Sequence, residues 1–115
     1  MEARHLTTSS RLLLSHEGAQ TSVPLDGLGS FIIGRGSDCG LALDSPYVSR
    51  RHARIARERQ YFVLIDESSN GTFVRSEDET LCHVHRGVFR LWGAGMLSFG
   101  QPFSLESVVR FEHLE

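Results

Sequence analysis

Short segments in which apolar and polar residues alternate run along most of the sequence, and glycine, proline and other turn formers interrupt them often. A two-residue period predicts β-strands that bury one face and expose the other. The predicted strands cover residues 11–17, 22–25, 31–34, 41–43, 52–57, 61–66, 72–75, about 81–91 with a break at Gly87, and 96–100.

The tail of the sequence fits two patterns. Phe103, Leu105, Val109 and Phe111 fall on one face of a strand, whereas Leu105, Val108 and Val109 have helical spacing. The alternation covers more positions, so it favours a final strand.

Roughly ten to eleven short strands, separated by turns about every eight to twelve residues, predict an all-β fold, a β-sandwich with little or no helix. A length of 115 residues suits one domain with one core. We expect that domain to span residues 10–113. Residues 1–9 are polar and are expected to be flexible, and residues 114–115 have the character of a cloning remnant.

Composition excludes several classes of protein. Apolar residues make up 40% of the chain and charged residues 23%, which is typical of a packed globular domain and not of a disordered one. The formal net charge of −2 gives no general attraction to nucleic acid or membranes. With no long apolar run and no apolar stretch at the start, the expected location is the cytoplasm.

Candidate catalytic and metal-binding residues are few. The chain has no lysine, which excludes Schiff-base chemistry, and Cys39 and Cys82 are expected to be reduced thiols without a role. His83 and His85 could lie on one strand face, but no third ligand is near them in the sequence. We therefore expect no metal and no cofactor.

In a sandwich of short strands, function is expected in the loops, and three loops carry polar clusters. The first is "GRGSDCG" at 34–40, where Arg35 directly follows Gly34 at a strand end. Its glycines do not complete the G-x-G-x-x-G spacing, and a Walker loop would need a lysine. Nucleotide binding through these motifs is therefore not expected.

The second cluster, "SPYVSRRH" at 45–52, begins a positive stretch. Residues 47–59 contain one acid, Glu58, and five arginines, at positions 50, 51, 54, 57 and 59. If a strand begins at His52, Ala53 faces the core and His52 faces the other side, beside the loop. We favour a structural histidine that holds the loop backbone over a general base.

The third cluster, "DESSNGT" at 66–72, contains Asn70-Gly71, a strong signal for a tight turn because both residues tolerate positive φ. Ser68 and Ser69 add hydroxyl groups before this turn.

In this order, Gly34-Arg35, the S-x-x-H element at 49–52 and the element "SNGT" at 69–72 resemble the forkhead-associated (FHA) domain, a β-sandwich that binds phosphothreonine. The resemblance runs from about residue 10 to about residue 111. Phosphothreonine carries nearly two negative charges and three strong acceptor oxygens, so its receptor needs cations, hydroxyls and backbone N–H groups at one point.

The resemblance implies a role for each residue at the site. Arg35 and Ser49 would contact the phosphate, Arg50 would add charge or a backbone N–H group, and Ser69 would line the site. Asn70 would bond the peptide backbone, within the Asn70-Gly71 element. His52 would brace the loop, and Gly34 would permit the turn that aims Arg35.

Tyr47 stays open between two interpretations: it reads the third residue after the phosphothreonine, or it packs against its own loop. Arg51 also stays open, between solvent and acidic residues of the ligand. The acidic segment "RSEDET" at 75–80 departs from the family pattern, which usually has a second turn rich in asparagine and glycine.

Three classes of function remain. The first is a non-catalytic phosphothreonine-binding module of signalling, whose partner is a phosphorylated protein and not nucleic acid or membrane. Such modules often belong to larger signalling proteins, and a bacterial adenylate or guanylate cyclase is one candidate parent. The second is an FHA-like docking or dimerisation scaffold that has lost phosphate binding. The third is a hydrolase using Ser49, His52 and Asp66, which lacks a nucleophile elbow and an evident oxyanion hole.

Overall fold

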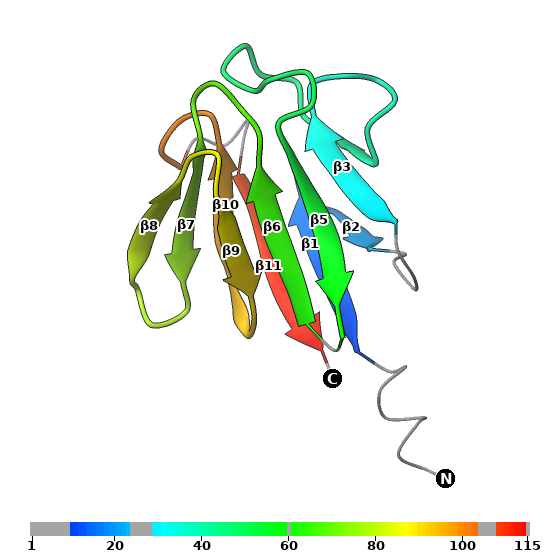
Figure 1. The fold of residues 1–115 in the computed structure, drawn as a ribbon, viewed down its shortest axis with the longest axis vertical. Helices are drawn as coiled ribbons and strands as arrows, with labels where there is room; N and C mark the ends of the chain where they lie inside the picture. The colour runs from blue at the N-terminus through cyan, green and yellow to red at the C-terminus, as the bar shows by residue number, and fades with distance from the viewer. Residues whose placement is uncertain (1–9, 24–28, 60, 104–107, 115) are drawn as a thin grey trace, which may run out of the picture.

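Two β-sheets packed face to face form the protein in the computed structural model, which describes residues 10–23, 29–59, 61–103 and 108–114 (Figure 1). These residues contain no helix, so none of them could cross a membrane as one. The strands are β1 (Arg11–His16), β2 (Ala19–Ser22), β3 (Ser30–Gly34), β4 (Leu41–Ala42), β5 (Ala53–Glu58), β6 (Tyr61–Asp66), β7 (Thr72–Ser76), β8 (Leu81–Val84), β9 (Val88–Leu91), β10 (Ala94–Phe99) and β11 (Val108–Leu114). The predicted all-β sandwich is confirmed.

One sheet has six strands in the order β2-β1-β11-β10-β7-β8, and the other has five in the order β4-β3-β5-β6-β9. The pairs are antiparallel except β3 with β4. The first and last strands are neighbours, with Arg11 opposite Leu114. The start of β1 and the end of β11 lie together at the lower pole of Figure 1, and the loops after β3, β4 and β6 lie at the upper pole.

The core lies between the sheets and follows from the alternation along each strand. Leu12 and Leu14 of β1 are buried while their odd-numbered neighbours are partly or fully exposed. The other fully buried large apolar side chains are Ile33, Leu43, Val48, Ile55, Phe62, Leu64, Val74, Leu91, Leu97, Phe99 and Val109. At about 1.5–3 kcal/mol for each buried large side chain, this layer is the main source of stability.

The second strand lies earlier in the chain than the alternation predicts. Residues 22–25 were expected to form it, but β2 is Ala19–Ser22, and residues 24 and 25 lie outside the described part. Glu17 and Gly18 have φ of 51° and 83°, which makes a two-residue hairpin turn directly after β1. Pairing His16 with Ala19 then starts β2 at once.

Two further predictions, the break near Gly87 and the final strand, are confirmed, and the place of Phe103 is corrected. The segment 81–91 divides at residues 85–87 into β8 and β9, which belong to different sheets. The tail forms a strand and not a helix over Val108–Leu114. Phe103 stands in a bend with φ of 29°, so it does not belong to that strand. Leu105 and the predicted flexible segment 1–9 lie outside the described residues.

Candidate functional site

Backbone hydrogen bonds join the first two polar loops at the upper pole. The Arg35 N–H donates to the Ser49 carbonyl at 2.9 Å, and the Gly36 N–H donates to the Arg50 carbonyl at 3.1 Å. A Cβ atom on Gly34 would lie 2.2 Å from the Arg50 carbonyl oxygen, so only glycine fits there. Glycine is required at position 34 because two backbone segments approach closely there, and not because a turn needs a positive φ.

The side chain of Arg35 is fixed at one of its nitrogens. Its Nε donates to the Val48 carbonyl at 3.0 Å, and the residue as a whole is exposed. This bond holds the plane of the guanidinium beside the Val48-Ser49 backbone. The terminal nitrogens are then directed from a fixed position, which suits bidentate recognition of an anion.

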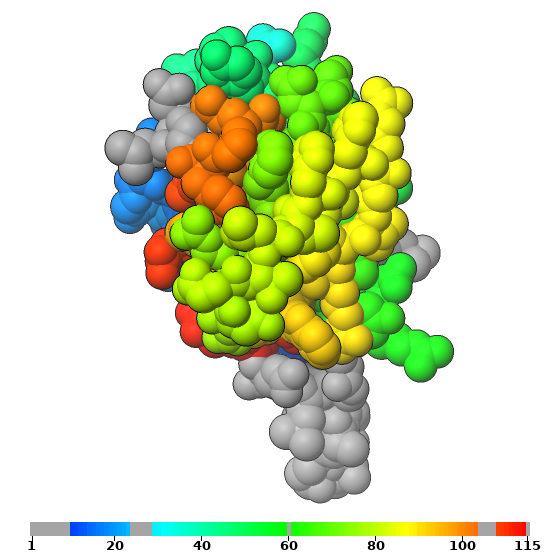
Figure 2. Space-filling model, turned by 90° about the vertical axis from the view of Figure 1, so that its left-hand side faces the viewer, coloured from blue at the N-terminus to red at the C-terminus, as the bar shows by residue number. Residues whose placement is uncertain are grey.

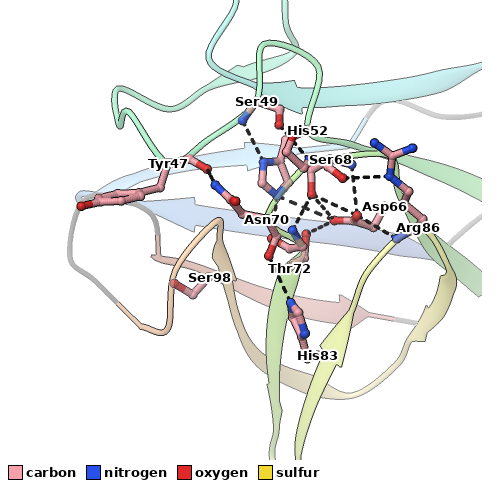
Figure 3. Close-up of polar contacts among 12 residues, drawn as sticks. Tyr47, Ser49, His52, Asp66, Ser68, Asn70, Thr72, His83, Arg86 and Ser98 are labelled. Atoms are coloured by element: carbon pink, nitrogen blue, oxygen red, sulfur yellow. Dashed lines mark hydrogen bonds and ion pairs between the residues drawn. The ribbon is translucent and has the colours of Figure 1, made fainter.

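Ser49 connects the second loop to the third. Its Oγ accepts the Ser69 N–H at 3.3 Å, and its own N–H donates to Nδ1 of His52 at 3.0 Å (Figure 3). Because a backbone N–H donates to Nδ1, that nitrogen is the acceptor of a neutral imidazole and Nε2 carries the proton. Nε2 therefore donates to the Gly71 carbonyl at 2.8 Å.

His52 is completely buried, contrary to the expectation that it would face the side away from the core. β5 begins only at Ala53, and the turn before it directs the ring inward, where it makes a T-shaped contact with Phe99 at 5.4 Å between ring centroids. Burial lowers the pKa of His52 below its ordinary value, although the Gly71 carbonyl and the Asp66 charge oppose the change. The neutral ring joins the loops on either side of it.

Asn70 and Gly71 complete the connection between loops. The Asn70 Nδ2 donates to the Tyr47 carbonyl at 3.1 Å. Gly71 has φ of 87°, its N–H donates to Ser68 Oγ at 2.7 Å, and its carbonyl also accepts the Gly100 N–H. The "SNGT" element is thus tied both to the second loop and to the end of β10.

A buried polar cluster beneath these loops was not identified from the sequence as a unit. The Asp66 carboxylate accepts hydrogen bonds from the Ser68 N–H and hydroxyl, from the Thr72 hydroxyl at 2.7 Å and from the Arg86 N–H at 3.0 Å (Figure 3). Burial by itself would raise the pKa of Asp66, but these donors outweigh it and lower that pKa. The spacing D-x-S-x-x-x-T at 66–72 was the available signal, because Asp and Ser side chains often bond the backbone two residues onward.

Two arginines of the second loop point to solvent. Arg50 is exposed, and its side chain has no hydrogen bond or ion pair to any described residue, while its carbonyl accepts the Gly36 N–H and the Cys39 thiol. Arg51 lies 3.8 Å from Asp38 in an exposed pair. Such pairs are weak, so both side chains can meet a ligand.

Tyr47 is 51% exposed, and in Figure 3 its ring points away from the His52 and Asp66 side chains. Its backbone, rather than its ring, contacts the rest of the site through Asn70. The ring is therefore placed at the margin of the loop surface.

The arrangement does not form a hydrolytic triad. Both ring nitrogens of His52 bond backbone groups, so neither is available to the Ser49 hydroxyl. Asp66 Oδ2 is 3.7 Å from Nε2, the nitrogen whose proton goes to Gly71. Cys39 and Cys82 are free thiols, and the described residues hold no group of three potential metal ligands.

A family model described as "FHA domain" matches residues 31–85, which contain all three loops. A search of curated proteins found no match. The FHA-1 domain of Rv1747 from Mycobacterium tuberculosis superposes with a TM-score of 0.73 at 20% identity, over 92% of this chain and 98% of that one. The FhaA FHA domain, solved with the intracellular domain of Rv3910, is 28% identical, with a TM-score of 0.65 over 90% and 99%.

The N-terminal FHA domain of Rad53p from S. cerevisiae, solved with a phosphothreonine peptide, gives a TM-score of 0.68 at 14% identity, over 91% of each chain. At 14% sequence identity, this similarity shows only that the two proteins share a fold. The family match, which covers every predicted loop motif, and the sandwich shared with many FHA structures agree with each other. Residues 31–85 therefore match the FHA domain family, within a sandwich that has the fold of FHA domain structures.

Proposed function

We propose that this FHA domain binds proteins phosphorylated on threonine, as a non-catalytic interaction module. One observation carries the proposal: Arg35, Ser49 and Arg50 come from two loops that backbone hydrogen bonds join side by side. A guanidinium held at Nε, a hydroxyl and a second exposed guanidinium would then meet a dianionic phosphate from adjacent loops, and this is a suitable environment for such a ligand.

The Ser49 hydroxyl is arranged as a donor. Its oxygen already accepts the Ser69 N–H, and its own O–H group makes no hydrogen bond to a described residue. Charge-assisted hydrogen bonds to phosphate are the strong kind, worth about 1.5–3 kcal/mol each. Ser49 would supply one of them.

Asn70 would hold the peptide itself. One bond of its amide, to the Tyr47 carbonyl, fixes the side chain at the surface between the second and third loops. Its carbonyl oxygen and remaining N–H would bond the backbone of an extended ligand lying across these loops. Tyr47 would lie beside the residues that follow the phosphothreonine.

One solved FHA structure supports the ligand class. It is 26% identical to this chain and comes from a study of phosphothreonine-dependent FHA interactions. Because such a ligand is made by an ATP-dependent kinase, the domain would act in the cytoplasm. It would form one part of a larger signalling protein.

The test is a titration with an oriented phosphothreonine peptide library, with unphosphorylated and phosphoserine libraries as controls. We expect binding that requires the phosphate and is strongest for phosphothreonine. If no phosphopeptide binds while the domain remains folded, the alternative of a scaffold without phosphate binding is correct.

A further inference from the structure

β9 (Val88–Leu91) is one of the two edge strands of the five-stranded sheet, and half of its backbone groups face away from the sheet. The Asp66 N–H donates to the Gly87 carbonyl, so Asp66 and Gly87 form a hydrogen-bonded pair. Bonded and non-bonded pairs alternate in an antiparallel ladder, which makes the pairs of Val88 with Ile65 and of Arg90 with Val63 non-bonded. The N–H and C=O groups of Val88 and Arg90 therefore point outward.

The side chains along this edge are unusually apolar for their exposure. Val88 is 66% exposed and Trp92, one residue beyond β9, is 62% exposed. Figure 2 faces this side of the sandwich, where the surfaces of β8 and β9 are uncovered (yellow to gold). Proteins normally protect a free strand edge with lysine, proline or a covering segment, and exposed apolar groups beside such an edge mark an interaction surface.

Arg90 stands between these two apolar residues and is held in place by aromatic rings. Its guanidinium carbon lies 4.0 Å from the centre of the Tyr61 ring and 4.8 Å from that of Trp92. Among the described residues no carboxylate pairs with it. A stacked guanidinium keeps the N–H groups of its edge available, and these match the two oxygens of a carboxylate.

We propose that the β9 edge (Val88, Arg90 and Trp92) binds an extended segment of a partner protein, which adds to the five-stranded sheet as a further strand. The segment places a Glu or Asp opposite Arg90 and apolar residues opposite Val88 and Trp92. Main-chain hydrogen bonds to Val88 and Arg90 supply affinity, and the side-chain pattern supplies specificity. This contact needs no phosphate and is separate from the loop site.

A second copy of the chain does not have the required chemistry. If two copies paired through β9, Arg86 and Arg90 of each would approach those of the other, and residues 81–94, which include β9, contain no acid. Like charges facing each other across strands are destabilising. The charge of the edge thus selects a different, acidic partner.

The experiment uses the 15N-labelled domain and two synthetic peptides, Thr-Val-Thr-Glu-Thr-Val-Thr and the same sequence with Lys in place of Glu, both acetylated and amidated. At millimolar peptide we expect shifts and slowed hydrogen exchange at the Val88 and Arg90 amides with the Glu peptide, and at least tenfold weaker binding of the Lys peptide. Absence of both effects with the Glu peptide would overturn the proposal.

Two variants test the charge and the backbone of this edge in turn. Arg90→Glu should reverse the preference, so that the Lys peptide binds better, with phosphopeptide affinity unchanged. Val88→Pro removes an outward N–H group and leaves the ladder to β6 intact, so it should abolish binding of the Glu peptide. Equal binding of both peptides by Arg90→Glu, or dimerisation through β9 in sedimentation, would contradict the assignment.

Discussion

The loop pole, formed by the loops at 34–40, 45–52 and 66–72, and the β9 edge distribute polar and apolar groups in opposite ways. At the loop pole the groups beneath the surface are polar, and no buried side-chain nitrogen or oxygen in the described residues lacks a partner. At the β9 edge two large apolar side chains, Val88 and Trp92, are exposed on either side of Arg90, and the support beneath them is an ordinary strand ladder. Irregular loops need a hydrogen-bonded foundation to aim side chains at a small anion, whereas a strand edge is already shaped for another strand.

Asp66→Ala removes the acceptor of the buried hydrogen-bonded cluster beneath the loop pole. This change leaves the Ser68, Thr72 and Arg86 donors without their acceptor in a buried place, and we expect a loss of about 3–5 kcal/mol of unfolding free energy. Urea denaturation measures the loss. Glu67→Ala, which removes only an exposed ion pair with Arg54, is the control and should cost less than about 1 kcal/mol. Similar losses for both variants would mean that the buried cluster does not support the loops.

Removing the Ser49 hydroxyl, which lies at the surface above the Asp66 cluster, should weaken phosphopeptide binding without changing the stability of the fold. Ser49→Ala deletes the proposed phosphate donor, so the Kd for a phosphothreonine peptide should rise about tenfold to a hundredfold, with an unchanged unfolding midpoint. Calorimetric titration gives the Kd. The exposed Ser37 of the first loop provides the matched control, Ser37→Ala, which should bind normally. An unaltered Kd for Ser49→Ala would exclude Ser49 as a phosphate ligand.

Acid should weaken the loop pole in two stages. Because the pKa of His52 is lowered by burial, the unfolded chain takes up that proton first, and stability falls as the pH drops below the ordinary value of 6.5. The pKa of Asp66 is also lowered, since its donors outweigh burial, so a further loss begins as the pH falls through the ordinary value of 3.8.

Unfolding free energies measured from pH 8 to pH 3 should show both stages, and His52→Gln should lack the first. If the variant keeps the decline near pH 6.5, another group is responsible for it.

The smallest effect is expected for Arg51→Ala. Its pair with Asp38 is exposed on both sides, so unfolding free energy should change by less than about 0.5 kcal/mol. Affinity should fall only for phosphopeptides with acidic residues beside the phosphothreonine. A uniform loss over all phosphopeptides would instead make Arg51 a phosphate ligand.

Much of the fold was predictable because alternation is a local signal: β3, β6 and β7 lie within one residue of their predicted ranges. The β2 boundary was missed because the hairpin turn before it needs a positive φ at Glu17. Glutamate rarely adopts such a φ, so the residue type does not indicate the turn. The burial of His52 also escaped prediction, because its direction depends on a turn between strands and on Gly71, nineteen residues away. The three loop motifs were recognisable one by one, but the Asp66 cluster beneath them exists only once β6, β7 and the segment before β9 come together.

The pairing of β1 with β11 has a consequence for the domain within any longer chain. Arg11 and Leu114 are opposite each other at the pole away from the loops, so a segment attached at either end would depart from there. Such a segment acts as a tether and not as a lid. The domain could then be carried on another protein, or inserted into one, with its loops still presented outward.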